Sequence, residues 1–141
     1  MKPQGDYSDE GAGGRRILSP KVALYLAALT VVAADGSIVS AETADMEKIV
    51  RGDQENFNLA CKTFGNASYE ECVHLVACSL TEQQQVALIA ILLDLAMADG
   101  VLSNPEEKLI SGYVQKFGIP VYVFRDLCHY ISMKNNTSLF D

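Results

Sequence analysis

Two long apolar segments dominate the pattern of hydrophobic and polar positions along the chain. Residues 22–34 and 86–98 consist mostly of Ala, Val, Leu and Ile, and Asp94 is the one charged residue inside them. Each segment ends at an Asp-Gly pair, a sequence that favours the end of a helix. A helix that is apolar on nearly all sides belongs in the interior of a domain. The pattern therefore predicts two central helices that the rest of the chain covers.

Start and stop signals divide the remaining chain into further helices. Ser, Thr, Asn or Pro opens most segments, and Gly or an Asp-Gly pair closes several of them. The predicted helices span residues 20–34, 40–51, 57–64, 69–79, 82–98, 105–117 and 120–133. No segment alternates apolar and polar residues as a strand does. The predicted fold class is therefore all-α, with a flexible leader at 1–18, a helical domain at 19–133 and a polar C-terminal tail at 134–141.

The two apolar segments belong to an internal repeat with an offset of 64 residues. Val-Ala-Leu opens both segments, and Ala-Asp-Gly closes them at 34–36 and 98–100. Six residues after each Gly stands a glutamate, Glu42 in the first unit and Glu106 in the second. These matches predict a duplicated helix–loop–helix unit with pseudo-two-fold symmetry inside a compact bundle of about seven helices.

The repeat resembles the TerB-like (tellurite resistance) family. The shared features are an apolar helix ending in Ala-Asp-Gly, a short turn with Ser or Asn, and a helix that begins with Glu. The resemblance covers residues 19–131, is most specific at 29–42 and 93–106, and extends to the N-terminal region of DjlA-type co-chaperones. It implies a bacterial stress-response domain that acts by binding and is not an enzyme. It also implies protein partners such as inner-membrane TerC-like proteins, and leaves a homo-oligomer open.

The acidic residues of the two turns are the candidate functional site. The resemblance carries the family's acidic positions onto Asp35 and Glu42 in the first unit, and onto Asp99 and Glu106 in the second. If the fold brings the two turns together, four carboxylates would offer the hard oxygen ligands that Ca²⁺ and Mg²⁺ prefer. This arrangement predicts a divalent-cation site on an acidic patch.

A second interpretation of the same residues needs no metal. With Ser40 and Asn104 as N-caps, Glu42 and Glu106 would occupy the second helical position, where a carboxylate stabilises the positive end of the helix. The acidic residues would then be helix caps only. The domain would be a pure protein–protein interaction module, and the sequence leaves both interpretations open.

Composition and charge exclude several other functions. The chain has 11 Lys and Arg residues against 18 Asp and Glu, a net charge of −7, so a nucleic-acid partner is not expected. No apolar run reaches the roughly 20 residues that span a bilayer, and the first residues do not resemble a signal peptide. We therefore expect a cytoplasmic protein without a direct membrane span. Its four cysteines, Cys61, Cys72, Cys78 and Cys128, are predicted to be reduced thiols without a zinc-binding spacing.

Three further residues carry chemistry that the repeat does not explain. Asp94 lies inside an apolar helix, so we expect it to face a solvated or hydrogen-bonded stripe, toward its repeat counterpart Thr30. His74 and Cys78 are four residues apart and share one helix face, which predicts that both pack into the core. No motif for a nucleophile or a phosphate-binding loop accompanies them.

Overall fold

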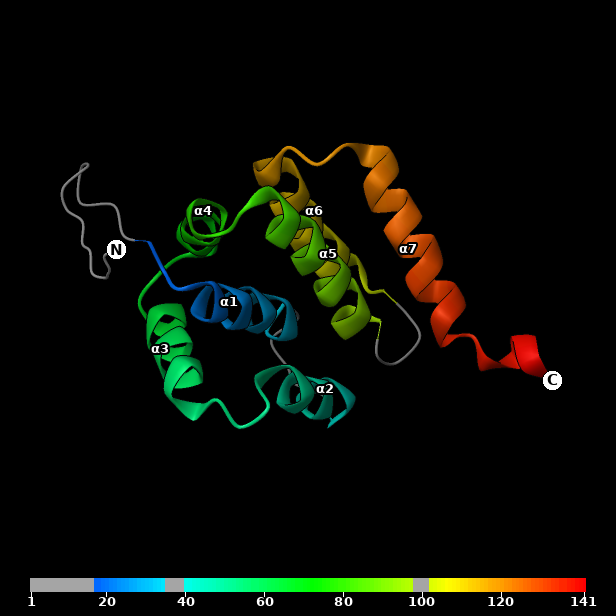
Figure 1. Cartoon of the computed structure of the whole chain (residues 1–141), viewed down its shortest axis with the longest axis horizontal. Coiled ribbons are helices and arrows are strands. Elements are labelled where there is room, and N and C mark those ends of the chain that lie inside the picture. Colours follow the sequence, from blue (N-terminus) through cyan, green and yellow to red (C-terminus); the bar gives the residue numbers. More distant parts are fainter. Residues whose placement is uncertain (1–16, 35–39, 98–101) are drawn as a thin grey trace.

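The structure is a computed structural model that describes residues 17–34, 40–97 and 102–141, without the side chains of residues 40–43. Within these ranges it contains seven α-helices, one 3₁₀ helix and no strand (Figure 1). The helices are α1 (Pro20–Val32), α2 (Ser40–Val50), α3 (Gln54–Gly65), α4 (Tyr69–Ser79), α5 (Glu82–Ala96), α6 (Asn104–Phe117), α7 (Val121–Asn135) and the 3₁₀ helix η3 (Thr137–Phe140). The predicted all-α class and the seven predicted helices are confirmed, with ends displaced by at most three residues.

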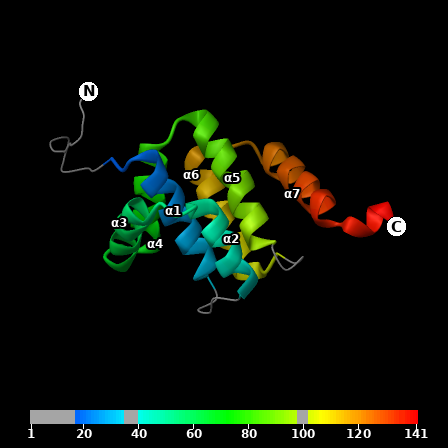
Figure 2. The same cartoon turned by 60° about the horizontal axis from the view of Figure 1, so that its bottom comes forward.

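The two apolar helices form the centre of the bundle, as the sequence predicted. Helix α1 packs against every helix from α2 to α6, and α5 packs against α1, α2, α6 and α7. Figures 1 and 2 show α1 running through the middle of the molecule. Nine of the thirteen residues of α1 are buried, which explains why its sequence has no polar face.

Several helices begin at short polar N-cap residues, at the positions that the sequence predicted. The hydroxyl groups of Ser68 and Thr81 accept the third backbone N–H of α4 and α5, and a Glu or Gln side chain returns the bond in each case. Gly118 adopts a left-handed backbone conformation, with φ 73°, and ends α6. These local interactions explain why the helix boundaries were predictable.

The repeat units make corresponding helix contacts. Helix α1 packs against α2, α6 and α3, and its counterpart α5 packs against α6, α2 and α7. The counterparts α3 and α7 differ in burial, because α3 contributes the buried residue Ala60 whereas α7 has no buried residue. The pseudo-two-fold axis itself stays a prediction, since the turns at 35–39 and 98–101 lie outside the described residues.

Hydroxyl groups form hydrogen bonds between α1 and α6 and between α4 and α6. Thr30 Oγ1 donates to the Ala27 carbonyl oxygen at 2.6 Å, and the Tyr113 hydroxyl lies 2.9 Å from Thr30 Oγ1. The Tyr69 hydroxyl donates to the Leu109 carbonyl oxygen at 2.6 Å. The rings of Tyr69 and Tyr113 meet edge to face. Burial raises the pKa of Tyr69 to about 12 and moves the pKa of Tyr113 further in the same direction.

The C-terminal helix lies at the edge of the bundle (Figure 1). Its main contact is with α5, and it carries exposed apolar residues along its length. The segment 134–141, predicted as a polar tail, contains the last two residues of α7 and the helix η3. The predicted leader at 1–18 lies outside the described residues up to residue 16, and the domain limits stay a prediction.

Candidate functional site

Glu106 is the one predicted metal ligand whose side chain the structure describes. Asp35 and Asp99 lie outside the described residues, and the side chain of Glu42 does as well. In the described part of the chain, no group of three or more His, Cys, Asp and Glu side chains is arranged to hold a metal ion. The proximity of the four carboxylates therefore stays a prediction.

Glu106 forms a capping box at the start of α6. Its backbone N–H donates to Ser103 Oγ at 3.3 Å, and the Ser103 N–H and hydroxyl donate to Glu106 Oε1 at 3.2 and 2.8 Å. The N-cap is thus Ser103, and the predicted cap at Asn104 is wrong. Asn104 and Pro105 occupy the first two helical positions instead, where the missing N–H of proline costs no helical hydrogen bond. Glu106 consequently stands at the third position and not the second.

The Glu106 carboxylate is buried, with 6% of the residue exposed. Both bonds from Ser103 go to Oε1, whereas Oε2 receives no hydrogen bond from the residues that the structure describes. A buried charge is normally compensated by donors or by an ion. Glu106 therefore has a clear structural role as a cap of α6.

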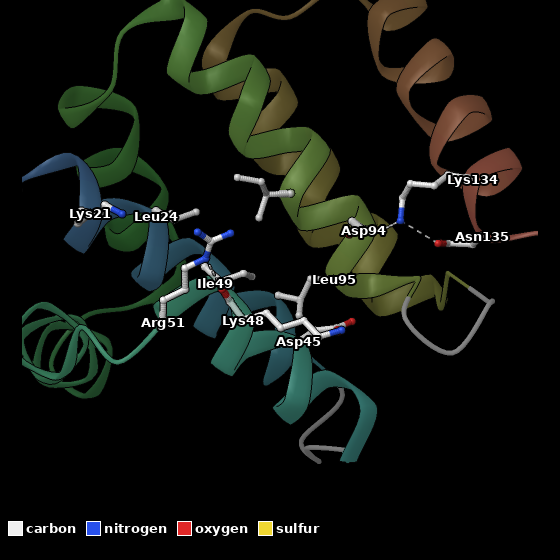
Figure 3. A pocket seen from close by; sticks show the side chains of 11 residues that line it. Lys21, Leu24, Asp45, Lys48, Ile49, Arg51, Asp94, Leu95, Lys134 and Asn135 are labelled. Carbon is white, nitrogen blue, oxygen red and sulfur yellow. Dashed lines mark hydrogen bonds and ion pairs between the residues drawn. The ribbon is translucent and has the colours of Figure 1, made fainter.

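A cavity of about 530 Å³ opens between α1, α2, α5 and the end of α7, and we call it the basic cleft (Figure 3). Four cationic and two acidic side chains line it over an apolar floor. The lining residues are Lys21, Leu24, Asp45, Lys48, Ile49, Arg51, Ile91, Asp94, Leu95, Lys134 and Asn135. The sequence does not predict this site, because its cations come from three separate helices and the residue after α2 and form no local motif.

The two carboxylates of the basic cleft are paired with two of its lysines. Asp94 Oδ1 lies 3.0 Å from Lys134 Nζ, and Asp45 Oδ1 lies 3.5 Å from Lys48 Nζ. The predicted solvated position of Asp94 is confirmed, since 48% of its side chain is exposed. The predicted approach to Thr30 is wrong, because Thr30 faces Tyr113 of α6 while Asp94 faces α7.

An apolar groove of about 190 Å³ adjoins the basic cleft between α1 and α5. Its lining residues are Pro20, Lys21, Leu24, Leu80, Gln84, Ala87, Leu88 and Ile91. Lys21, Leu24 and Ile91 line both spaces. The cleft and the groove are therefore neighbouring parts of one surface.

Cys72 and Cys128 are not activated thiols. Burial raises the pKa of Cys72 and Cys128, so both thiols stay protonated at neutral pH. Cys78 Sγ lies 3.6 Å from His74 Nε2, which confirms that the two residues share a face. The predicted core position of His74 is wrong: it is exposed, because the buried face of α4 is formed by Cys72, Val73 and Val76.

Comparison with known proteins adds one finding to this geometry. A family model described as tellurite resistance protein TerB matches residues 21–127. Searches of curated proteins and of solved structures give no significant match, so the similarity to DjlA-type co-chaperones stays a prediction. Among the described residues, no helix has the length and apolar character needed to cross a membrane. The match covers most of the chain, from the first turn of α1 into α7, and the chain therefore belongs to the TerB family of tellurite resistance proteins.

Proposed function

We propose that this TerB-family chain acts in tellurite resistance as a non-catalytic binding domain, and that α7 carries the surface that docks a protein partner. The observation behind the proposal is the distribution of exposed apolar side chains. Six of the nine large exposed hydrophobic residues among those described lie in α7 and η3. The four on α7, which we call the α7 surface, are Val121, Tyr122, Tyr130 and Met133.

The chemistry of the α7 surface matches that of protein interfaces. Tyr122 and Tyr130 are 67% and 63% exposed, and tyrosine and methionine are enriched where proteins meet. Helix α7 also has no buried residue of its own, so a partner could cover its outer side without disturbing the core.

The partner that the family resemblance suggests is a TerC-like protein of the inner membrane. The chain would then act from the cytoplasmic side and reach the membrane through this partner. The partner's contribution would be a complementary apolar surface, since Tyr122 and Tyr130 bring both ring area and a hydroxyl group. Catalysis is not part of the proposal, because no activated nucleophile or base stands out among the described residues.

Binding of the purified chain to a TerC-like protein in lipid nanodiscs tests this function. Tyr122→Glu/Tyr130→Glu should weaken binding at least about tenfold, because central aromatic residues dominate interface energies. Leu59→Glu is the matched control, since Leu59 is 50% exposed on the distant helix α3. Both proteins should keep the wild-type unfolding temperature. Equal binding by the double variant and the control would contradict the proposal.

A divalent-cation site formed by Asp35, Glu42, Asp99 and Glu106 is the second candidate function. The buried Glu106 carboxylate supports it, because Oε2 has no partner among the described residues. The bound ion would be Ca²⁺ or Mg²⁺, since the site offers only carboxylate oxygens. If no ion binds, the same residues serve as helix caps and the interaction function stands alone.

The variant Glu106→Gln separates the cation site from the cap. Glutamine can complete a capping box as glutamate does, but it lacks the charge that holds a divalent ion. If a cation binds, Ca²⁺ or Mg²⁺ should raise the unfolding temperature of the wild type more than ionic-strength-matched NaCl does, and Glu106→Gln should lose that excess. Asp35→Asn/Asp99→Asn should lose it too. A wild type that responds equally to both salts would exclude the cation site.

A further inference from the structure

The basic cleft concentrates positive charge in an acidic protein. Four of the eight Lys and Arg residues that the structure describes line it, although the formal net charge of the whole chain is −7. Lys48 and Lys134 are paired with carboxylates of the cleft. Lys21 and Arg51 have no carboxylate oxygen within 4.0 Å in the described part of the chain. The side chains that line the cleft are therefore four cations against two carboxylates, and this excess of positive charge favours an anionic ligand.

The positions of Lys21 and Arg51 are not explained by helix stability. Lys21 lies in the first turn of α1, where the helix dipole disfavours a cation. Arg51 has a left-handed backbone, with φ 53°, which residues other than glycine seldom adopt. Its Nε donates to the Lys48 carbonyl oxygen at 3.2 Å, so the guanidinium group is oriented and its other nitrogens remain for a ligand. Figure 3 shows Lys21 and Arg51 on the side of the cleft opposite the Asp94–Lys134 pair.

The apolar groove supplies the second feature of the site. It begins at Lys21, Leu24 and Ile91, which also line the basic cleft, and continues along Ala87 and Leu88 of α5. A ligand whose charged group lies near Lys21 would thus have the apolar groove directly beside it. A small inorganic anion would not contact the apolar groove.

We propose that the basic cleft and the apolar groove together bind an amphiphilic anion, a small ligand with a phosphate head and a short alkyl chain. The head would lie between Lys21 and Arg51, where charge-assisted hydrogen bonds hold phosphate oxygens. The chain would lie over Leu24 and Ile91 and cover apolar surface that is now in contact with water. The ligand chemistry has two sources, a free alkyl phosphate or the headgroup end of an anionic lipid.

Calorimetric titration of the full chain with octyl phosphate and methyl phosphate, both as monomers, tests the two features separately. The wild type should bind octyl phosphate at least about tenfold more tightly, because the alkyl chain occupies the groove. Lys21→Gln/Arg51→Gln should weaken binding of octyl phosphate at least about tenfold. Lys62→Gln/Lys108→Gln is the matched control, since it removes the same charge at exposed positions outside the cleft.

Ala87→Gln tests the groove, because it places a polar amide in the groove from an exposed position on α5. It should reduce the affinity for octyl phosphate to that for methyl phosphate and leave methyl phosphate binding unchanged. Vesicles of phosphatidylglycerol then distinguish the sources. Vesicle binding that Lys21→Gln/Arg51→Gln abolishes would identify the lipid headgroup, and octyl phosphate binding without vesicle binding would identify a free amphiphile.

Three results would overturn the proposal. Equal affinity for octyl and methyl phosphate would mean that the groove takes no part. Full octyl phosphate binding by Lys21→Gln/Arg51→Gln would mean that the cleft does not hold the head. Vesicle binding without binding of monomeric octyl phosphate would indicate adsorption to a charged surface and no defined site.

Discussion

Replacing Thr30 by Val should destabilise the domain more than replacing Tyr113 by Phe, although both changes remove the same hydrogen bond. Thr30 has one hydroxyl hydrogen, which it donates to the Ala27 carbonyl oxygen at 2.6 Å. The Tyr113 hydroxyl, 2.9 Å from Thr30 Oγ1, must therefore be the donor in the bond between the two side chains. Tyr113 is completely buried, so this donor has no access to water.

The expected magnitudes follow from which group is left without a partner. Thr30→Val keeps the side-chain volume and leaves a buried phenol O–H without its acceptor, which costs about 1–3 kcal/mol of unfolding free energy. Tyr113→Phe removes the donor and leaves Thr30 bonded to Ala27, so the cost is about 0.5–1.5 kcal/mol. In the double variant no buried donor is stranded. Its stability should be close to that of Tyr113→Phe alone.

Urea unfolding at 25 °C, followed by far-UV circular dichroism, measures these differences as a double-mutant cycle. Unchanged m-values would show that the variants differ in stability and not in compactness. Because the double variant should resemble Tyr113→Phe alone, the coupling energy between the two substitutions should equal the cost of Thr30→Val, about 1–3 kcal/mol. Additive losses, or a larger loss for Tyr113→Phe, would refute the assigned direction of the hydrogen bond.

Three further predictions concern the core. Gly112→Ala should lower stability by about 1–3 kcal/mol, because its new methyl group would overlap the Tyr69 hydroxyl, and Tyr69→Phe should restore part of the loss. Cys72→Ala should cost about 1–2 kcal/mol in urea unfolding and Cys61→Ala less than about 0.5 kcal/mol, since Cys72 is buried and Cys61 is exposed. The raised pKa of Tyr69, about 12, and the still higher pKa of Tyr113 mean that the folded state holds these protons more tightly than the unfolded state. Thermal unfolding should therefore show stability that starts to fall above about pH 9, where the thiols of Cys72 and Cys128 begin to ionise in the unfolded state, and that falls further above about pH 10 as the tyrosines do. The loss above about pH 10 should be less steep in Tyr69→Phe, and no decrease up to about pH 12 would contradict this.

The helices could be predicted from the sequence because their signals are local. Ser68, Thr81 and Gly118 act within one turn of their own positions, and the apolar runs around α1 and α5 need no partner to be recognised. The wrong cap at Asn104 also has a local cause. Both Ser103 and Asn104 can cap a helix, and the choice depends on which of them the following glutamate can reach.

The basic cleft could not be predicted from the sequence, because its residues meet only after the helices have packed. Lys21, Arg51 and Lys134 are separated by long stretches of chain, and no spacing relates them. The same reason explains why Asp94 does not approach Thr30, as the repeat had predicted. Repeat counterparts share a sequence position, but their partners depend on different neighbouring helices, α7 for Asp94 and α6 for Thr30.

Tellurite tolerance of living cells tests most directly whether the α7 surface serves the function of the family. A bacterial host that lacks its own TerB-type protein would express the wild type, Leu59→Glu or Tyr122→Glu/Tyr130→Glu, and the minimum inhibitory tellurite concentration would be measured at equal protein abundance. The wild type and Leu59→Glu should restore the same tolerance, because Leu59 lies away from the proposed interface. The double variant should fall to the level of the empty vector. Full tolerance with Tyr122→Glu/Tyr130→Glu would contradict the account.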